Sequence, residues 1–70
     1  MKIDEVDKNL GKTVHYRNDF RLLDHDFRFN AHIKRATVNN DVVHEAELQH
    51  LGNKGSLLIV PLEEVQVKTV

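Results

Sequence analysis

Five histidines are the side chains of this 70-residue chain whose chemistry stands out: His15, His25, His32, His44 and His50. Imidazole nitrogens bind metal ions and exchange protons near neutral pH. The segment "DHD", residues 24–26, also places one histidine between two carboxylates. None of the five follows an H-x-H or H-x-x-x-H spacing, which would direct two rings at one ion. We therefore expect no metal site and no cofactor, and we interpret the histidines as solvated or hydrogen-bonded in loops.

Nucleophilic catalysis needs a hydroxyl or thiol beside an oriented base. The chain has one serine, Ser56 in a predicted turn, no cysteine, and threonine only at positions 13, 37 and 69. The carboxylates Glu45 and Glu47 fall on the outward side of a predicted strand, opposite cations, as on an ordinary solvated sheet. A domain of this size also has little room for a ligand pocket of about 300 Å³ or more. The sequence therefore predicts that the protein is not an enzyme.

Positive charge is concentrated in one part of the chain. The net charge is −1, but residues 12–35 contain six Lys or Arg against three Asp, whereas residues 36–70 contain two Lys against five acids. The candidate nucleic-acid contacts on this basic segment are Arg17, Arg21, Arg28, His32 and Lys34. Two features favour a merely solvated, salt-bridged face instead: the nearby rings of Phe27 and Phe29 point inward, and Glu45 and Glu47 oppose the cations.

Alternating apolar and polar residues predict that strands position these side chains. Ile3, Val6 and Leu10 first mark one face of a short helix, which Gly11 ends. Strand alternation follows in residues 13–17, 27–38 and 42–50, and a long, partly packed loop is expected over residues 18–26. "NND" and "LGNKG" mark the two following turns.

A two-residue loop at Asn39-Asn40 would fix the register of the central hairpin. The expected pairs are Ile33 with Ala46, Ala31 with Leu48, Lys34 with Glu45, and His32 with Glu47. Apolar residues then meet apolar residues and cations meet anions. The same register puts Arg35 opposite His44 on the inner face, so we expect a β-bulge near Arg35–Ala36.

The end of the chain, "SLLIVPLEEVQV", predicts a short buried strand that Pro61 ends, a single helical turn, and a last short strand. Five strands, a long first loop and a helical turn before the final strand resemble the layout of the SH3-like and Sm-like small barrels. The resemblance covers nearly the whole chain and implies an all-β domain over residues 1–70, a five-strand SH3-like barrel. The glycine-containing signature of Sm-like RNA binders and the aromatic, acidic first loop of SH3 domains are missing, so no binding residue is carried over. The sequence also resembles small proteins of bacterial mobile elements.

A chain of 70 residues is near the lower limit for a self-sufficient core, and without cysteine it has no disulfides to support it. Leu22, Leu23, Leu51 and Val67 are apolar residues that a small barrel interior need not accommodate, so we expect them at an interface. The first ten residues lack a signal-peptide pattern and no apolar run could span a membrane, so we expect a cytoplasmic protein. The predicted function is a non-catalytic binding or adaptor module that associates with itself or another protein; the alternative is a nucleic-acid-binding regulator.

Overall fold

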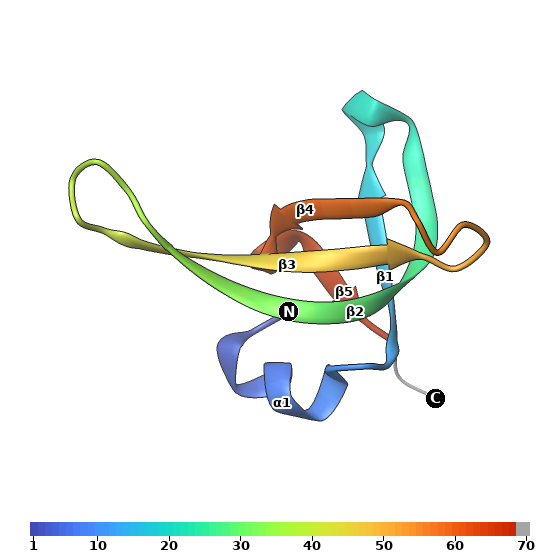
Figure 1. Ribbon diagram of the computed structural model, residues 1–70, viewed down its shortest axis with the longest axis horizontal. Coiled ribbons are helices and arrows are strands. Elements are labelled where there is room, and N and C mark those ends of the chain that lie inside the picture. The colour runs from blue at the N-terminus through green and yellow to red at the C-terminus, as the bar shows by residue number, and fades with distance from the viewer. Residues whose placement is uncertain (69–70) are drawn as a thin grey trace.

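The computed structural model describes residues 1–68 and shows one five-stranded antiparallel sheet with strand order β4-β3-β2-β1-β5 (Figure 1). The strands are β1 (Thr13–Asn18), β2 (Leu23–Ala36), β3 (Val42–His50), β4 (Leu57–Pro61) and β5 (Val65–Val67). Helix α1 (Val6–Asn9) follows the 3-10 turn η1 (Ile3–Glu5), and the 3-10 turns η2 (Asp19–Arg21) and η3 (Leu62–Glu64) connect strands. The predicted all-β class is therefore confirmed.

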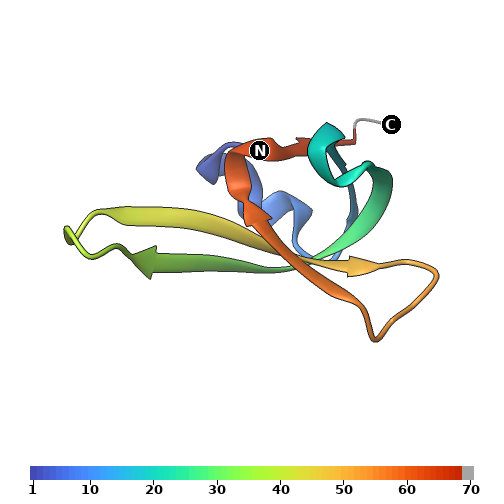
Figure 2. The same cartoon turned by 90° about the horizontal axis from the view of Figure 1, so that it is seen from above.

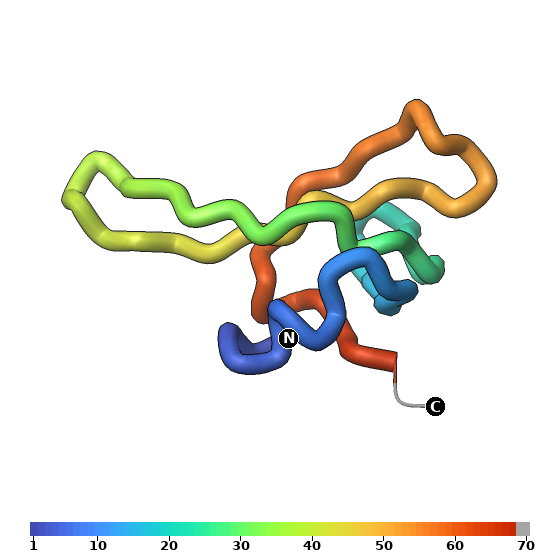
Figure 3. The backbone as a smooth tube through the Cα atoms, turned by 60° about the horizontal axis from the view of Figure 1, so that its bottom comes forward, coloured from blue at the N-terminus to red at the C-terminus, as the bar shows by residue number. Residues whose placement is uncertain are grey.

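Strand β2 is long enough to belong to two hairpins. Its first part, Leu23 to Arg28, pairs with β1, whereas β3 pairs with it from Phe27 to Ala36. The strand curves strongly along its length, so the β1–β2 hairpin stands across β3 and β4 (Figure 1). The far end of the β2–β3 hairpin extends away from the rest of the molecule in all ribbon and tube views (Figures 2 and 3). We call this projecting part, residues 32–44, the arm.

The core lies on the concave side of the sheet. Its largest fully buried side chains are those of Tyr16, Phe29, Leu48, Val14, Val60 and Val65. Val6 of α1 and Leu62 of η3 cover them, and Val60 lies opposite Ala46 in the ladder. These residues come from all five strands and both ends of the chain, which is why such a short sequence forms one continuous core.

The predicted barrel is not confirmed, because the described ladders leave β4 and β5 as the two edges of an open sheet. The connection between these strands is nevertheless the single helical turn that the sequence predicted. The prediction of a long loop over residues 18–26 was wrong. Asn18 and residues 23–26 extend the β1–β2 ladder, and only η2 and Leu22 form the turn. Asn18 begins η2 by accepting a hydrogen bond from the Arg21 backbone.

The predicted register of the central hairpin was wrong. Ile33 pairs with Glu45 rather than Ala46, and Phe29 rather than Ala31 pairs with Leu48. The turn explains the difference: it has five residues, 37–41, closed by a hydrogen bond from Thr37 N to Asp41 O. The Thr37 hydroxyl accepts two more backbone N–H groups, and Asn40 takes the left-handed conformation with φ of 65°. The expectation that Ala46 and Leu48 face the core is correct.

The β-bulge lies at Asn30, between the pairs Phe29–Leu48 and Ala31–Glu47, and not near Arg35. Phe29 is held from the other side as well, because it accepts from Gly11 N and donates to Lys12 O. Gly11 makes this approach with a φ of 82°, which an L-residue adopts only with strain. One extra residue exchanges the two faces of a strand. His32 and Lys34 therefore lie on the side of the sheet that carries the core, while Ala31 and Ile33 lie on the outer side.

Candidate functional site

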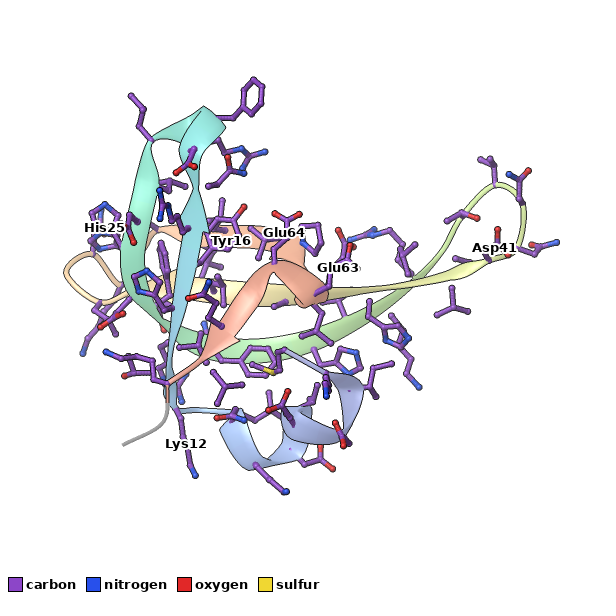
Figure 4. All side chains as sticks on the ribbon, turned by 180° about the vertical axis from the view of Figure 1, so that it is seen from behind. Lys12, Tyr16, His25, Asp41, Glu63 and Glu64 are labelled. Atoms are coloured by element: carbon purple, nitrogen blue, oxygen red, sulfur yellow. The ribbon has the colours of Figure 1, made fainter. Side chains whose placement is uncertain are left out.

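A groove lies between the base of the arm and the N-terminal segment. It has a volume of about 980 Å³ and is lined by Met1, Lys2, Ile3, Asp4, Val42, Val43, His44, Glu45, Pro61, Leu62 and Glu63. Three separate segments thus meet there: η1 with the residues before it, the arm strand β3, and the end of β4 with η3. Figure 4 shows Glu63 near the base of the arm and Asp41 at its far end.

The groove combines an apolar lining with an acidic rim. Met1, Ile3 and Val42 supply its apolar surface, and the side chains of Ile3 and Val42 remain well exposed to solvent. Leu62 also lines the groove but is almost fully buried. The lining contains three carboxylates, those of Asp4, Glu45 and Glu63, and one lysine, Lys2. The Met1 amine fixes one wall, because it donates hydrogen bonds to Leu62 O, at 3.2 Å, and to Val65 O. Such a surface suits an apolar partner that also carries positive charge.

His32 and His44 form a pair on the arm. Their rings are stacked with centroids 5.1 Å apart, and His32 Nε2 lies 2.9 Å from His44 Nδ1. One ring must donate and the other accept in this contact, so the pair requires a ring nitrogen that is free of its proton. Within residues 1–68, no group of three or more His, Cys, Asp or Glu side chains is arranged to hold a metal ion.

His15 lies between two carboxylates on the outer face of the sheet. Its Nδ1 is 2.7 Å from Asp26 and its Nε2 is 2.6 Å from Asp24, and Asp26 also binds the Lys68 ammonium. Hydrogen bonds that the His15 ring donates to the carboxylates of Asp26 and Asp24 raise the pKa of His15. Hydrogen bonds from Lys68 and His15 lower the pKa of Asp26. The two ring nitrogens thus contact different acids, and His15, Asp24, Asp26 and Lys68 form one charged network on this face.

The predicted basic residues do not form one surface. Arg17 and Arg28 lie on the outer face, but Arg17 is paired with Asp19 at 2.8 Å, and His15 and its acids lie between them. Arg28 donates to Asn30 beside the bulge. Arg21 lies on η2 at the far end of the β1–β2 hairpin. The bulge places His32 and Lys34 on the opposite side of the sheet from Arg28.

The four predicted interface residues differ in exposure. Leu22 and Leu51 are exposed, whereas Leu23 packs against the core and Val67 pairs with Val14 in the β1–β5 ladder. Sequence reasoning missed the most exposed apolar side chains, Phe20 at 102% and Val38 at 99%. Each is the apolar residue nearest a chain reversal. That position in a hairpin turn, far from any core, was the signal that could have identified them.

Ser56 lies at a second, smaller cavity of about 250 Å³ with His25 and His50 in its lining. The Nδ1 atom of His50 is occupied as an acceptor for the backbone N–H groups of Gly52 and Asn53. No hydrogen bond among the described residues joins the Ser56 hydroxyl to either ring. The serine and the histidines are therefore not assembled as a nucleophile with its base.

None of the helices in residues 1–68 has the length and apolar composition needed to cross a membrane. Comparison of the chain with protein-family models, curated proteins and solved structures gives no match.

Proposed function

We propose that the protein is a non-catalytic binding module that acts by associating with protein surfaces, first of all with a second copy of itself. The observation that carries this proposal is the division of the large apolar side chains. The buried core has ten residues, and an equal number of large hydrophobic residues is exposed: Ile3, Leu10, Phe20, Leu22, Val38, Val42, Val43, Leu51, Leu57 and Ile59. A monomer that buries no more than half of its apolar residues gains little from folding alone.

The size of the surface supports the same proposal. The accessible area is 5145 Å², whereas a monomer of 8.1 kDa is expected to expose about 4,500 Å². The radius of gyration is 12.1 Å, against about 11 Å for a compact chain of this length. Both excesses are consistent with the projecting arm, which buries little of its own surface. A segment of this kind is most readily stabilised by a partner.

The fold is also suited to binding rather than catalysis. A strand order of β4-β3-β2-β1-β5 with a helical turn joining the edge strands supports a relationship to the SH3-like small barrels. Folds with open strand edges and shallow grooves bind through those features. The hydrogen bonds that engage both nitrogens of His15 and one nitrogen of His50 support a structural role for these two histidines.

Nucleic-acid binding remains the second candidate, and it has weaker support. Its candidate residues Arg17, Arg21, Arg28, His32 and Lys34 are divided between two faces and a turn. Single-stranded nucleic acid is bound by a continuous cationic track with exposed rings for stacking. Phe20 is the one fully exposed aromatic ring in the described chain, and Arg21 is adjacent to it.

Sedimentation equilibrium over micromolar concentrations tests the proposal. We expect a reversible dimer or larger assembly, and a monomer throughout this range would overturn self-association. Binding of fluorescent single-stranded DNA and RNA, measured at about 50 mM salt, where phosphate contacts are strongest, tests the second candidate function. Retention that falls steeply with added salt would favour the nucleic-acid function over the adaptor function.

A further inference from the structure

We propose that the arm of one copy lies in the groove of a second copy and that the second arm returns the contact, so that two copies embrace around a two-fold axis. This inference rests on the proposed self-association and names the surface that makes it. Arm and groove are adjacent parts of one chain, which is the arrangement that lets two identical molecules exchange them reciprocally.

The apolar chemistry of the two surfaces matches. The arm ends in Val38, which is 99% exposed and has no side chain of its own molecule to cover it. The groove presents the exposed side chain of Ile3 and the half-buried side chain of Met1 around a volume of about 980 Å³. That volume exceeds what a single side chain fills and is large enough to receive a turn with apolar residues. Burial of these methyl groups would supply the main attraction.

The charges of the two surfaces are complementary. Lys34 and Arg35 lie on the arm, and Arg35 already binds Glu45 of the same molecule at 2.6 Å. Lys34 has no ion-pair partner within residues 1–68, and neither do Asp4 and Glu63 at the groove. A reciprocal docking would bring the ammonium of each copy to the carboxylates of the other. Complementary charges of this kind fix orientation and exclude wrong partners.

The excess accessible area of the chain is comparable with the area that each partner buries in a stable dimer. The chain exposes roughly 600 Å² more than a compact monomer of its mass, by comparison with the usual scaling. A standard interface buries about 800 Å² on each partner. Docking of the arm and closure of the groove would thus remove most of the excess surface. Phe20 on η2 and Leu22 directly after it are also exposed, and they take no part in this contact.

A charge exchange between two variants tests the contact. One variant carries Lys34→Glu on the arm, and the other carries Asp4→Lys with Glu63→Lys at the groove. Each variant alone places like charges at both contacts of its homodimer, so we expect its dissociation constant to rise at least about tenfold. In an equimolar mixture, both contacts of the mixed dimer pair opposite charges again. We therefore expect the mixture to recover an affinity close to that of the wild type.

Controls separate the contact from general effects of charge and folding. Lys54→Glu makes the same change in the exposed β3–β4 turn, and we expect it to leave the dissociation constant unchanged. Val38→Ser removes apolar surface at an exposed position and should weaken the dimer while the urea midpoint at low protein concentration is kept. An associating wild type whose affinity is insensitive to these arm and groove changes, or a mixture that does not recover, would overturn this inference and leave self-association standing. A monomeric wild type would overturn both.

Discussion

The two halves of β2 have nearly the same alternating sequence but opposite structural roles. In the first half, Phe27 and Phe29 point into the core and Arg28 points to solvent. In the second half, beyond the bulge at Asn30, it is His32 and Lys34 that lie on the core side of the sheet. The core does not extend that far, so polar residues occupy a face that would otherwise require apolar ones.

The single residue inserted at Asn30 thus converts the continuation of a core strand into a projecting surface. Without the bulge, the alternation of Phe27 and Phe29 would continue through Ala31 and Ile33 as one apolar face. With it, the arm carries histidines and a lysine above an apolar groove. The rest of the described chain, which we call the body, is stabilised by the packing of its core. The arm depends on its turn, the Arg35–Glu45 ion pair and the His32–His44 contact.

The largest expected difference comes from replacing a large apolar side chain by alanine in each half of β2. Phe29→Ala leaves a cavity at a fully buried site, and we expect the free energy of unfolding to fall by about 3–5 kcal/mol, enough to unfold a domain of this size. Ile33→Ala lies on the outer side of the arm and should cost about 1 kcal/mol or less. Urea denaturation of both variants measures the contrast. Equal losses would show that the arm is as tightly packed as the body.

The junction between the two halves can be weakened at Gly11. Its φ of 82° lets its N–H reach Phe29 O at 2.7 Å, directly beside the bulge. Gly11→Ala meets no close backbone atom, so its cost is the left-handed conformation itself, about 1–2 kcal/mol. The urea midpoint should fall accordingly. Gly55→Ala, in the exposed β3–β4 turn without a positive φ, is the matched control and should change little.

The turn at the other end of the body offers a stabilising change. Leu22 adopts a φ of 55°, so its backbone is strained, and its side chain is exposed and does not contribute to the core. Leu22→Gly removes the strain at some cost in unfolded-chain entropy, and we expect stability to stay level or rise by up to about 1 kcal/mol. A measured loss above this magnitude would show that Leu22 makes a stabilising contact, which would restore it as a candidate interface residue.

The smallest effect is a pH dependence confined to the body. The raised pKa of His15 stabilises the fold below its unfolded value of about 6.5 and loses that contribution as the pH rises through the folded pKa. The lowered pKa of Asp26 stabilises the fold above about 3.9 and loses it as the pH falls through the folded pKa. Both contributions are therefore complete between about pH 4 and 6.5.

Urea midpoints measured at about pH 5.5 and pH 8.5 test this sign, because only the His15 contribution changes across that interval. We expect the wild type to lose more stability between these two conditions than His15→Gln does. An identical loss in both proteins would show that the contacts of His15 with Asp24 and Asp26 do not stabilise the fold in solution.

Much of the fold could be predicted from the sequence, because alternation reports which residues face a core. The short N-terminal helix, most strand positions, the turn after Pro61 and the inward direction of Ala46 and Leu48 were predicted correctly. Residues 23–26, assigned to a loop, belong to β2, and the strand at 57–60, expected to be buried, exposes Leu57 and Ile59. The register and the bulge could not be predicted. In "FRFNAHIK", apolar and polar residues alternate without interruption, so the sequence gives no sign that the two faces exchange at Asn30. The position of the bulge depends instead on Gly11 and Lys12, which are distant in sequence and clamp Phe29.

The candidate site was less predictable for the same reason. The expected basic face treated Arg28, His32 and Lys34 as neighbours on one side of a strand, and the bulge separates them. The groove brings residues 1–4 against residues 42–45 and 61–63, a contact that no local pattern encodes. The apolar residues at the hairpin turns were visible in the sequence, but their full exposure depends on how far the arm projects from the body.

In the proposed dimer, the arm of each copy occupies the groove of the other. The most direct test of this contact is an isotope-filtered NMR measurement on an equimolar mixture of labelled and unlabelled protein, which detects contacts between copies alone. Docking of the arm predicts intermolecular contacts from the methyl groups of Val38 to the side chains of Met1 and Ile3. Intermolecular contacts confined to other surfaces, such as Phe20 and Leu22 at η2, or no intermolecular contact at a concentration where the protein is dimeric, would contradict it.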